Sequence, residues 1–267
     1  MIGPAKGRTV ARLARRIEAC ATSFHVRVRT PRGEATEIIT RNQRDCRSRL
    51  CPISAAWSAA TMRRKVQALI DEVFAARPDA RALFLTLTLP AQPAVSASLK
   101  PLKAALKRFR AIPDVIANTR GIFISIEVTV GGTPDAPTLH IHAHGLVIVD
   151  GGPGGYFKGG VPRVHQTTWA QWWQTAARLD RKPVVDIRAA RGPSGETDPA
   201  SVRRSAAELA KYAISPAHFA HDDNGITADP TIVLALHTLL KGQQLVSFDR
   251  CFKDAQQRLK TNPRNPS

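Results

Sequence analysis

Residues 139–149 read Leu-His-Ile-His-Ala-His-Gly-Leu-Val-Ile-Val, and this stretch decides the fold of the chain. Side chains alternate between the two faces of a β-strand, so His140, His142 and His144 project from the same face. The apolar run that follows them is typical of a strand that enters a buried core. An exposed polar strand face is the plain alternative, but such a strand rarely carries three histidines without a ligand. The stretch therefore predicts a core strand with a metal site on one face.

An acidic partner for these histidines lies in the preceding strand. Residues 121–130 form a second predicted strand, and the turn-like residues 131–137 join the two strands as an antiparallel hairpin. Glu127 lies in this mostly apolar strand, where a carboxylate is costly to bury unless it meets a cation. The alternative for Glu127 is an exposed position at a sheet edge. Imidazole and carboxylate ligands suit Mg²⁺ or Mn²⁺ with a phosphate completing the shell, and zinc would also bind the imidazoles.

Hydrophobic periodicity and turn signals extend the prediction outward along the chain. Helices are predicted at residues 8–20, 54–77, 99–112, 166–179, 199–213 and 231–241, and further strands at 24–30, 82–89 and 184–190. This mixture indicates an α+β fold in which helices flank a central, mainly antiparallel sheet. We expect an N-terminal lobe at residues 1–80 that could bind DNA, a catalytic core at 81–220, and C-terminal helices with a flexible tail at 221–267.

The chain carries a strong positive charge. It has 39 Lys and Arg residues against 21 Asp and Glu residues, which gives a net charge of +18. Such a field attracts polyanions, of which nucleic acid is the commonest, although a merely basic protein or an Arg-rich genome would give the same composition. We expect nucleic-acid contacts from Lys103 and Lys107 on the basic helix 99–112, and from Arg203 and Arg204 on the helix 199–213.

The helix at residues 166–179 carries three tryptophans. Trp169 and Trp173 are one helical turn apart, and this spacing favours two core positions. Trp172 is then the more exposed ring, and it could stack on an unpaired base.

A tyrosine and a glutamate share one face of the helix 199–213. Glu208 and Tyr212 are at positions i and i+4, which sets a carboxylate beside a phenol. The carboxylate could act as a base on the phenol or on a water, and Lys211 could hold a phosphate or lower the phenol pKa. A Glu and a Tyr at this spacing often only decorate a helix. However, the chain has only two tyrosines, and Tyr156 lies in a glycine-rich loop without a nearby acid. Tyr212 is therefore the better candidate nucleophile.

The four cysteines do not resemble a disulfide framework in a chain of this length. Cys46 and Cys51 could form part of a metal-binding knuckle, and Cys20 could complete at most a three-thiolate site. A further ligand three residues after Cys51 would fall at Ser54, which is a poor zinc ligand. Reduced, packed cysteines are the favoured interpretation, and structural zinc is the alternative.

Four motifs, in this order and spacing, resemble those of a known family. They are Phe84-Leu-Thr-Leu-Thr88, Glu127-Val-Thr129, His140-x-His142-x-His144 and Glu208-x-x-Lys211-Tyr212. Together they look like the motifs of plasmid rolling-circle replication initiators, which belong to the HUH endonucleases. The segment from Cys46 to Pro52, the pair Tyr156-Phe157 and the tryptophan helix are similar too, so the resemblance spans roughly residues 46 to 216.

The resemblance implies a role for each matching residue. His142 and His144 would be the metal pair, with His140 and Glu127 as further candidate ligands for Mg²⁺ or Mn²⁺. Tyr212 would be the nucleophile, and Glu208 would activate the water that ends the reaction cycle. The chain departs from the family pattern at two places, because Ser54 stands where many relatives have a cysteine and Ser215 stands where a lysine often follows the tyrosine. Lys211 could take over the phosphate-binding task of that lysine.

The function implied by the resemblance is to nick one strand of a plasmid origin, at a single-stranded or hairpin site. Tyr212 would become joined to a 5′-phosphate, and the free 3′-hydroxyl would be extended by a host polymerase after a host helicase is recruited. Such an initiator works in the cytoplasm, and no run of roughly 18 apolar residues predicts a membrane helix. Two alternatives remain: an HUH transposase or relaxase with the same chemistry, and a catalytically silent DNA-binding relative. A second motif tyrosine or a tyrosine ahead of the histidines would favour the first alternative, and the chain shows neither.

Overall fold

The computed structural model describes residues 4–20, 24–29, 37–42, 45–133, 135–190, 202, 221–222, 225–226 and 229–261. The chain divides into two compact units. The smaller unit comprises Met1–Ser58 and Pro216–Lys241, and the larger comprises Ala59–Ser215 and Gly242–Ser267.

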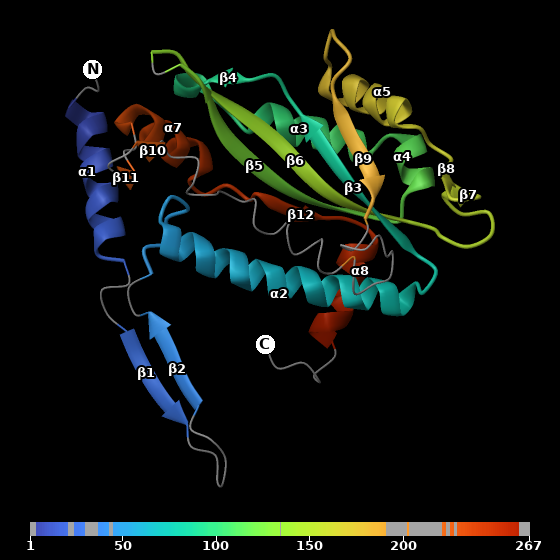
Figure 1. Ribbon diagram of the computed structural model, residues 1–267, viewed down its shortest axis with the longest axis horizontal. Coiled ribbons are helices and arrows are strands. Elements are labelled where there is room, and N and C mark those ends of the chain that lie inside the picture. The colour runs from blue at the N-terminus through green and yellow to red at the C-terminus, as the bar shows by residue number, and fades with distance from the viewer. Residues whose placement is uncertain are drawn as a thin grey trace. The chain divides into compact units, whose positions relative to one another are not determined.

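The larger unit is built around one antiparallel sheet with the strand order β12-β5-β6-β3-β9 (Figure 1). Its strands are β3 (Arg81–Thr88), β5 (Gly121–Gly132), β6 (Pro137–Val149), β9 (Val185–Ala189) and β12 (Val246–Phe248). The short strand β4 (Gln92–Pro93) also pairs with β6. The predicted hairpin is the β5–β6 pair, and the predicted α+β class with a mainly antiparallel sheet is confirmed.

The register of β6 sorts its side chains onto two faces of the sheet. His142 lies opposite Glu127 of β5 and opposite Thr88 of β3. His144 lies opposite Ser125 and Thr86 in the same way. Because side chains directly opposite in a ladder share a face, all these residues lie on one face, which we call the histidine face. The intervening β6 residues, such as Ile141 and Ala143, lie on the opposite face and are fully buried.

Two helices cover one end of the histidine face. They are α2 (Pro52–Ala76), of which Ala59–Ala76 belongs to this unit, and α8 (Cys251–Thr261). One buried cluster joins apolar residues of both helices to the sheet residues Phe123, Leu146 and Ile148, and Val202 belongs to it as well. The sheet residues lie beyond His144 on β6 and its neighbour, so the core ends where the histidines begin. Its α2 members are Val66, Leu69, Ile70, Val73 and Phe74.

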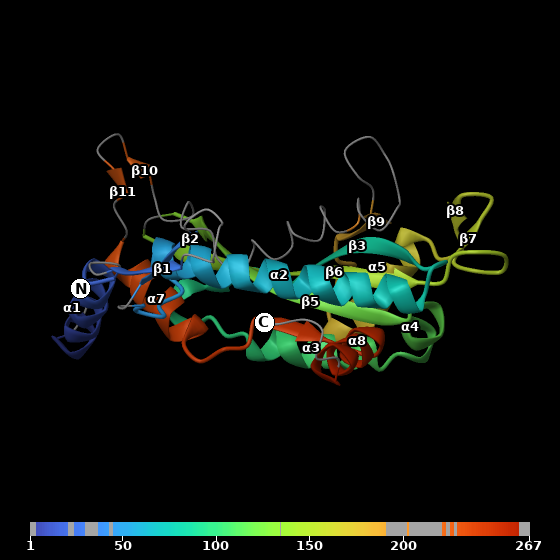
Figure 2. The same ribbon diagram turned by 90° about the horizontal axis from the view of Figure 1, so that it is seen from below.

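The opposite face of the sheet packs against α3 (Lys100–Arg110) and α5 (Gln166–Ala177). Figure 1 shows both helices on the other side of the strands from α2, and Figure 2 shows α2 in front of the strands. The ring of Phe109 contacts Trp169 and Trp173 at centroid distances of 6.1 and 5.9 Å. Trp173 also donates its indole N–H to the backbone oxygen of Thr88 at 2.9 Å. Trp169 and Trp173 are completely buried and Trp172 is half-buried, which confirms the division predicted from their spacing.

The smaller unit holds α1 (Pro4–Glu18), the hairpin of β1 (Phe24–Arg29) and β2 (Glu37–Asn42), the two-residue strands β10 (His221–Asp222) and β11 (Gly225–Ile226), and α7 (Pro230–Leu240). α1 packs against α7. Asp229 caps α7, because its carboxylate accepts a hydrogen bond from the backbone N–H of Thr231 at 2.7 Å.

Several elements differ from the sequence-based expectation. The short helix α4 (Pro113–Asn118) and the strand β12 were not expected, and α8 lies in the region where C-terminal helices were expected without exact bounds. The two compact units meet at Ser58, because the later turns of α2 pack into the core of the sheet, and β12 and α8 belong to the larger unit. The predicted domains at residues 1–80, 81–220 and 221–267 stay predictions. The remaining short elements are η1 (Ala94–Ser96), β7 (Phe157–Lys158) and β8 (Val161–Pro162).

Among the described residues, no helix combines the length and the apolar character that crossing a bilayer requires.

The packing of the tryptophans gives a test of this fold. We expect Trp173→Ala to lower the free energy of unfolding by about 3–5 kcal/mol, because it leaves a cavity beside Phe109 and removes the hydrogen bond to Thr88. Trp172→Ala, at a half-buried position on the same helix, should cost about 1 kcal/mol or less. Urea unfolding followed by circular dichroism measures both variants, and equal losses would contradict the assignment of the core face of α5.

Candidate functional site

The histidines of β6 form a row on the part of the histidine face that the described helices leave uncovered. His140 and His142 have ring centroids 6.4 Å apart with nearly parallel planes, and His142 and His144 are 6.2 Å apart with planes tilted by 32°. All three side chains are half-buried. The row follows directly from the two-residue period of the strand, as the sequence predicted.

Two threonines of the neighbouring strand β3 hold two of the rings. Thr88 Oγ1 lies 3.1 Å from His142 Nδ1, and Thr86 Oγ1 lies 3.2 Å from His144 Nδ1. Each hydrogen bond fixes a ring orientation and leaves Nε2 as the nitrogen turned away from the threonine. Sequence analysis missed this role, although both threonines lie in the quoted motif of β3. The signal was their alternate spacing, which matches that of the histidines.

Glu127 lies beside the histidines, as the predicted hairpin required. Its Oε2 is 2.7 Å from His144 Nε2, so the carboxylate reaches diagonally across the ladder from its position opposite His142. The residue is 8% exposed, so the carboxylate is buried rather than placed at an exposed edge. A buried carboxylate in contact with an imidazole is a candidate pair of cation ligands.

The surroundings favour the neutral, metal-binding form of His142. Burial lowers the pKa of His142, the charges of His144 and His140 lower it further, and Glu127 opposes the shift. A neutral imidazole is the form that binds metals. Ser125, opposite His144, adds a buried hydroxyl that has no hydrogen-bond partner among the described residues. An unsatisfied buried polar atom is costly, so its presence here suits a site that receives a polar ligand.

The donor set fits a divalent cation, but the side chains as they stand do not surround one point. Among the described residues, the nitrogen and oxygen atoms of the three histidines and Glu127 do not all lie within 4.8 Å of one another. His140 turns its Nε2 toward Thr138 Oγ1, 3.5 Å away. The pair His144–Glu127, with His142 next to it, is therefore the centre of the candidate site, and His140 is a more distant member.

The two tyrosines differ sharply in what the structure describes. Tyr156 is 5% exposed, donates its hydroxyl to the backbone oxygen of Val164 at 3.2 Å and accepts from the Trp169 indole at 3.0 Å. Burial raises the pKa of Tyr156, which makes its phenol a poorer nucleophile. Tyr212 lies outside the described residues, as do Glu208, Lys211, Arg203 and Arg204.

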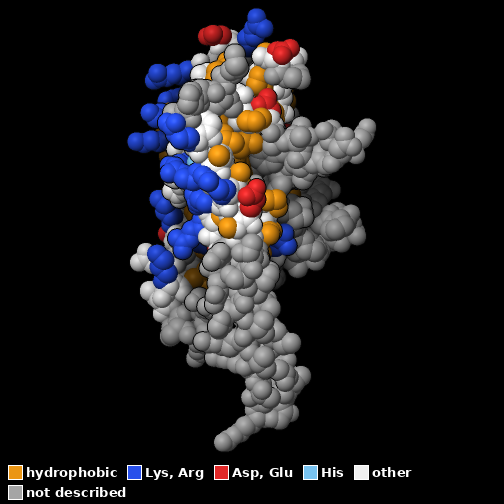
Figure 3. Space-filling view, turned by 90° about the vertical axis from the view of Figure 1, so that its left-hand side faces the viewer, with side chains coloured by type: hydrophobic (Ala, Val, Ile, Leu, Met, Phe, Trp, Pro, Cys, Tyr) orange, Lys and Arg blue, Asp and Glu red, His pale blue; other side chains and the backbone are white. Residues whose placement is uncertain are grey.

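The predicted DNA contacts on α3 lie behind the sheet. Lys107 is exposed, and Lys103 donates its ammonium group to Gln243 Oε1 at 2.7 Å. Because α3 packs on the face opposite the histidines, any DNA contact made by these lysines lies away from the histidine row. Figure 3 shows Lys and Arg side chains gathered along one edge of the face that it draws, with few acidic side chains among them.

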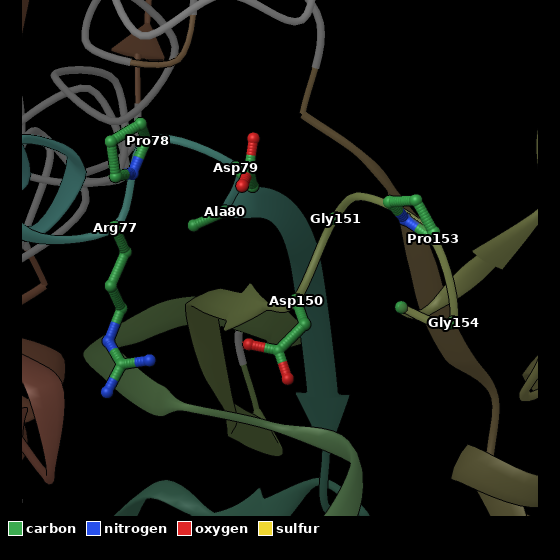
Figure 4. Close-up of a pocket in the computed structure, with 9 residues that line it drawn as sticks. Arg77, Pro78, Asp79, Ala80, Asp150, Gly151, Pro153 and Gly154 are labelled. Carbon is green, nitrogen blue, oxygen red and sulfur yellow. The ribbon is translucent and has the colours of Figure 1, made fainter.

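A pocket of about 400 Å³ lies elsewhere in the larger unit, between the start of β3 and the glycine-rich loop after β6. Arg77, Asp79 and Asp150 line it (Figure 4). Asp150 is held by an ion pair with Arg120. The pocket is at the far end of β6 from His142, roughly 25 Å away at the rise of a strand, so it is separate from the candidate site.

The comparisons with known proteins agree with the motifs. A family model described as "Replication protein" matches residues 38–266. The "Protein rep" of Lactiplantibacillus plantarum is 29% identical over 221 residues, covering 80% of this chain and 66% of that protein. The "Protein rep" of Lentilactobacillus hilgardii is 30% identical with the same coverage, and that of Streptococcus pneumoniae is 27% identical over 217 residues, covering 80% of this chain and 63% of that protein. The chain thus spans slightly less than two thirds of the length of these relatives. No solved structure matches it.

The role of Glu127 can be tested without DNA. We expect Glu127→Gln to weaken Mn²⁺ binding by about 10–100-fold, because it removes the charge beside His144 while keeping the shape of the side chain. Isothermal titration calorimetry with Mn²⁺ measures the change. The matched control is Glu72→Gln on α2, where the carboxylate pairs with Arg258. Unchanged affinity in Glu127→Gln would remove Glu127 from the ligand set.

Proposed function

The chain belongs to the Replication protein family, and on this premise we propose that it starts rolling-circle replication of a plasmid by nicking one DNA strand with Tyr212. The observation that carries the proposal is the register of β6, which gathers His142, His144 and Glu127 on one sheet face. That face suits a cation that binds a scissile phosphate.

Elimination supports Tyr212 as the nucleophile. The chain has two tyrosines, and the hydroxyl of Tyr156 is buried, hydrogen-bonded on both sides and raised in pKa. A phenol that attacks a phosphate must be reachable by DNA and able to lose its proton. Tyr156 meets neither requirement, so a tyrosine-based reaction falls to Tyr212.

The position of Val202 supports Tyr212 further. Val202 is completely buried in the cluster that contains Leu146, on the same face as the histidines. Val202 lies near the start of the predicted helix 199–213 that carries Glu208 and Tyr212, so the buried Val202 is consistent with a role for this segment on the histidine face.

In this proposal His142, His144 and Glu127 hold a divalent cation, Mg²⁺ or Mn²⁺. When bound, the cation would neutralise charge that develops on the non-bridging oxygens of the scissile phosphate. Thr86 and Thr88 keep the two imidazoles in position through their Nδ1 atoms. The half-buried setting of the row limits the access of water and so strengthens these interactions.

The covalent steps balance without a nucleotide cofactor. The Tyr212 oxygen attacks phosphorus, the bond from phosphorus to the 3′-oxygen breaks, and that oxygen takes a proton to become a free 3′-hydroxyl. The phenol proton passes to Glu208 or to solvent, and Tyr212 is left esterified to the 5′-phosphate. A host polymerase then extends the 3′-hydroxyl as a primer, while a host helicase unwinds the duplex ahead of it. Glu208 later activates a water, or stabilises the second cleavage, to end the cycle.

A transposase or relaxase would use the same chemistry, and a silent DNA-binding relative would use none. The similarity to proteins named for replication favours the initiator over both. The Glu127–His144 contact also disfavours a silent relative, since burial of a carboxylate that binds no cation costs free energy of folding.

A nicking assay tests the proposal. With supercoiled plasmid or single-stranded origin DNA and Mn²⁺, we expect a covalent protein–DNA adduct on a denaturing gel. Tyr212→Phe should abolish the adduct because the attacking oxygen is missing, and a chelator should abolish it in the unaltered protein. Glu208→Gln should form the adduct but release it slowly.

The matched control is Tyr156→Phe, which removes the same oxygen from a buried tyrosine and should keep the adduct. Circular dichroism shows whether each variant is folded. An adduct in Tyr212→Phe would refute the nucleophile, and the absence of any nick by a folded, Mn²⁺-binding protein would favour the silent relative.

Salt dependence separates the predicted DNA contacts. If Arg203 and Arg204 each bind a phosphate near the site, replacing one by Ala should reduce the slope of log affinity against log salt by about 0.7–0.9. We expect Lys107→Ala, on the opposite side of the sheet, to change the slope for a short single-stranded nick site by much less. Fluorescence anisotropy over a salt series measures these slopes. A change in slope for Lys107→Ala as large as that for the arginine variants would show that the basic helix α3 contacts the DNA.

A further inference from the structure

Three cysteines come together in the smaller unit, away from the histidine row in the sequence. Cys20 follows α1, and Cys46 and Cys51 lie in the loop before α2. Their Sγ atoms all lie within 4.8 Å of one another. Each cysteine is free of a disulfide and buried, with exposed fractions of 6%, 9% and 1%. Among the described residues this is the single group of three or more His, Cys, Asp or Glu side chains gathered so closely.

A fourth polar group closes the cluster. Ser54, only 3% exposed, places its Oγ 3.2 Å from Cys46 Sγ and 3.5 Å from Cys20 Sγ. The same hydroxyl donates a hydrogen bond to Asp45 Oδ1 at 2.6 Å. The Ser54 hydroxyl is therefore in contact with two of the three sulfur atoms.

We propose that Cys20, Cys46 and Cys51 bind one Zn²⁺ ion as thiolates, with the fourth, oxygen ligand on the side of Ser54 and Asp45. The four-residue spacer between Cys46 and Cys51 is within the usual range for two zinc ligands of one loop. Arg47, in this loop, has a φ of 50°, a left-handed turn that folds the loop back on itself. Three thiolates and one oxygen ligand complete the tetrahedral shell of zinc.

The surroundings suit a negatively charged thiolate cluster. Cys51 directly precedes α2 and its backbone oxygen accepts from Ala55 N at 2.8 Å, so the thiol lies at the N-terminus of the helix, where negative charge is favoured. The guanidinium of Arg16 donates to the backbone oxygen of Cys46.

Simple hydrophobic packing explains the cluster less well. Its buried members are the three cysteines alone, with Ile17 packed against them. Such a small core buries little apolar area, and it also encloses the hydroxyl of Ser54. A metal ion that links the end of α1 to the start of α2 would supply the cross-link that this apolar area does not.

The site also includes a residue beyond the family match. The family model begins at residue 38, so it contains Cys46 and Cys51 but not Cys20. Ser54 in place of a cysteine weakens a zinc site that is built from the loop of Cys46 and Cys51 alone. Cys20 supplies the third thiolate from a separate helix.

Cobalt substitution tests the proposal on the full chain. The reduced, metal-free protein is titrated with Co²⁺, which replaces Zn²⁺ and gives a thiolate-to-cobalt charge-transfer band in the near ultraviolet. We expect a band that saturates at one equivalent and disappears when Zn²⁺ is added. Because His142 and His144 could also take up cobalt, the thiolate band and not total binding is the readout. His142→Ala should leave that band unchanged.

Variants of single cysteines locate the ligands. We expect a more than about tenfold weaker Co²⁺ affinity, measured by titration of the thiolate band, in each of the variants Cys20→Ser, Cys46→Ser and Cys51→Ser. The control is Cys251→Ala, because Cys251 is buried in the other unit and burial raises its pKa to about 12. Ser54→Cys should strengthen binding and intensify the band, since a fourth thiolate replaces the oxygen ligand.

The outcome in the unaltered protein decides the proposal even if a variant fails to fold. No thiolate band with the folded, reduced chain would overturn it and leave packed thiols as the explanation. A band that depends on Cys251 as strongly as on Cys20 would overturn it as well. A band unaffected by Cys20→Ser would restrict the site to the loop and refute the three-thiolate set.

Discussion

The register in which β6 pairs with both of its neighbours is the constraint on which the larger unit depends. It places His142 between Glu127 and Thr88, and His144 between Ser125 and Thr86. A slip by one residue would turn the histidines into the core behind α3 and α5 and expose Ile141 and Ala143. The apolar half of the same strand prevents the slip, because Leu146 and Ile148 must meet α2. The core and the site are thus specified by one alternating pattern, apolar at one end of the strand and polar at the other.

This division explains why the chemistry lies where it does. Among the described residues, α2 and α8 meet the histidine face beyond His144, at Leu146 and Ile148, and the row from His144 to His140 is half-buried. The other face is closed completely by α3 and α5, with Trp169 and Trp173 at its centre. The buried hydroxyl of Tyr156 belongs to that closed side, where the indole of Trp169 holds it. Its environment makes Tyr156 a poor nucleophile, which is the ground on which Tyr212 is proposed.

Much of this was predictable because it depends on local periodicity. The histidine strand, its hairpin with the strand of Glu127 and the burial of Trp169 and Trp173 all follow from spacings of two or four residues. The strand β12 could not be found in this way, since three residues pair with a segment more than a hundred positions earlier. The role of Thr86 and Thr88 depends on a register between β3 and β6, which no single-strand pattern contains. The sequence named Cys20 with Cys46 and Cys51 as an alternative three-thiolate set, but their approach depends on tertiary structure, which no spacing in the sequence contains. Residues 203–220, which carry Glu208 and Tyr212, lie outside the described residues, so their predicted roles stay predictions.

The placement of the histidines on a strand paired along both edges has a consequence for binding energy. Flexible loops must lose backbone freedom when they close on an ion, at a cost of about 1–2 kcal/mol for each residue that becomes ordered. β6 has already lost that freedom on folding, and the threonine hydroxyls have removed much of the rotational freedom of two imidazole rings. If these side chains bind a cation as proposed, the entropy of organising them is lost in the folding of the protein and not in each binding event.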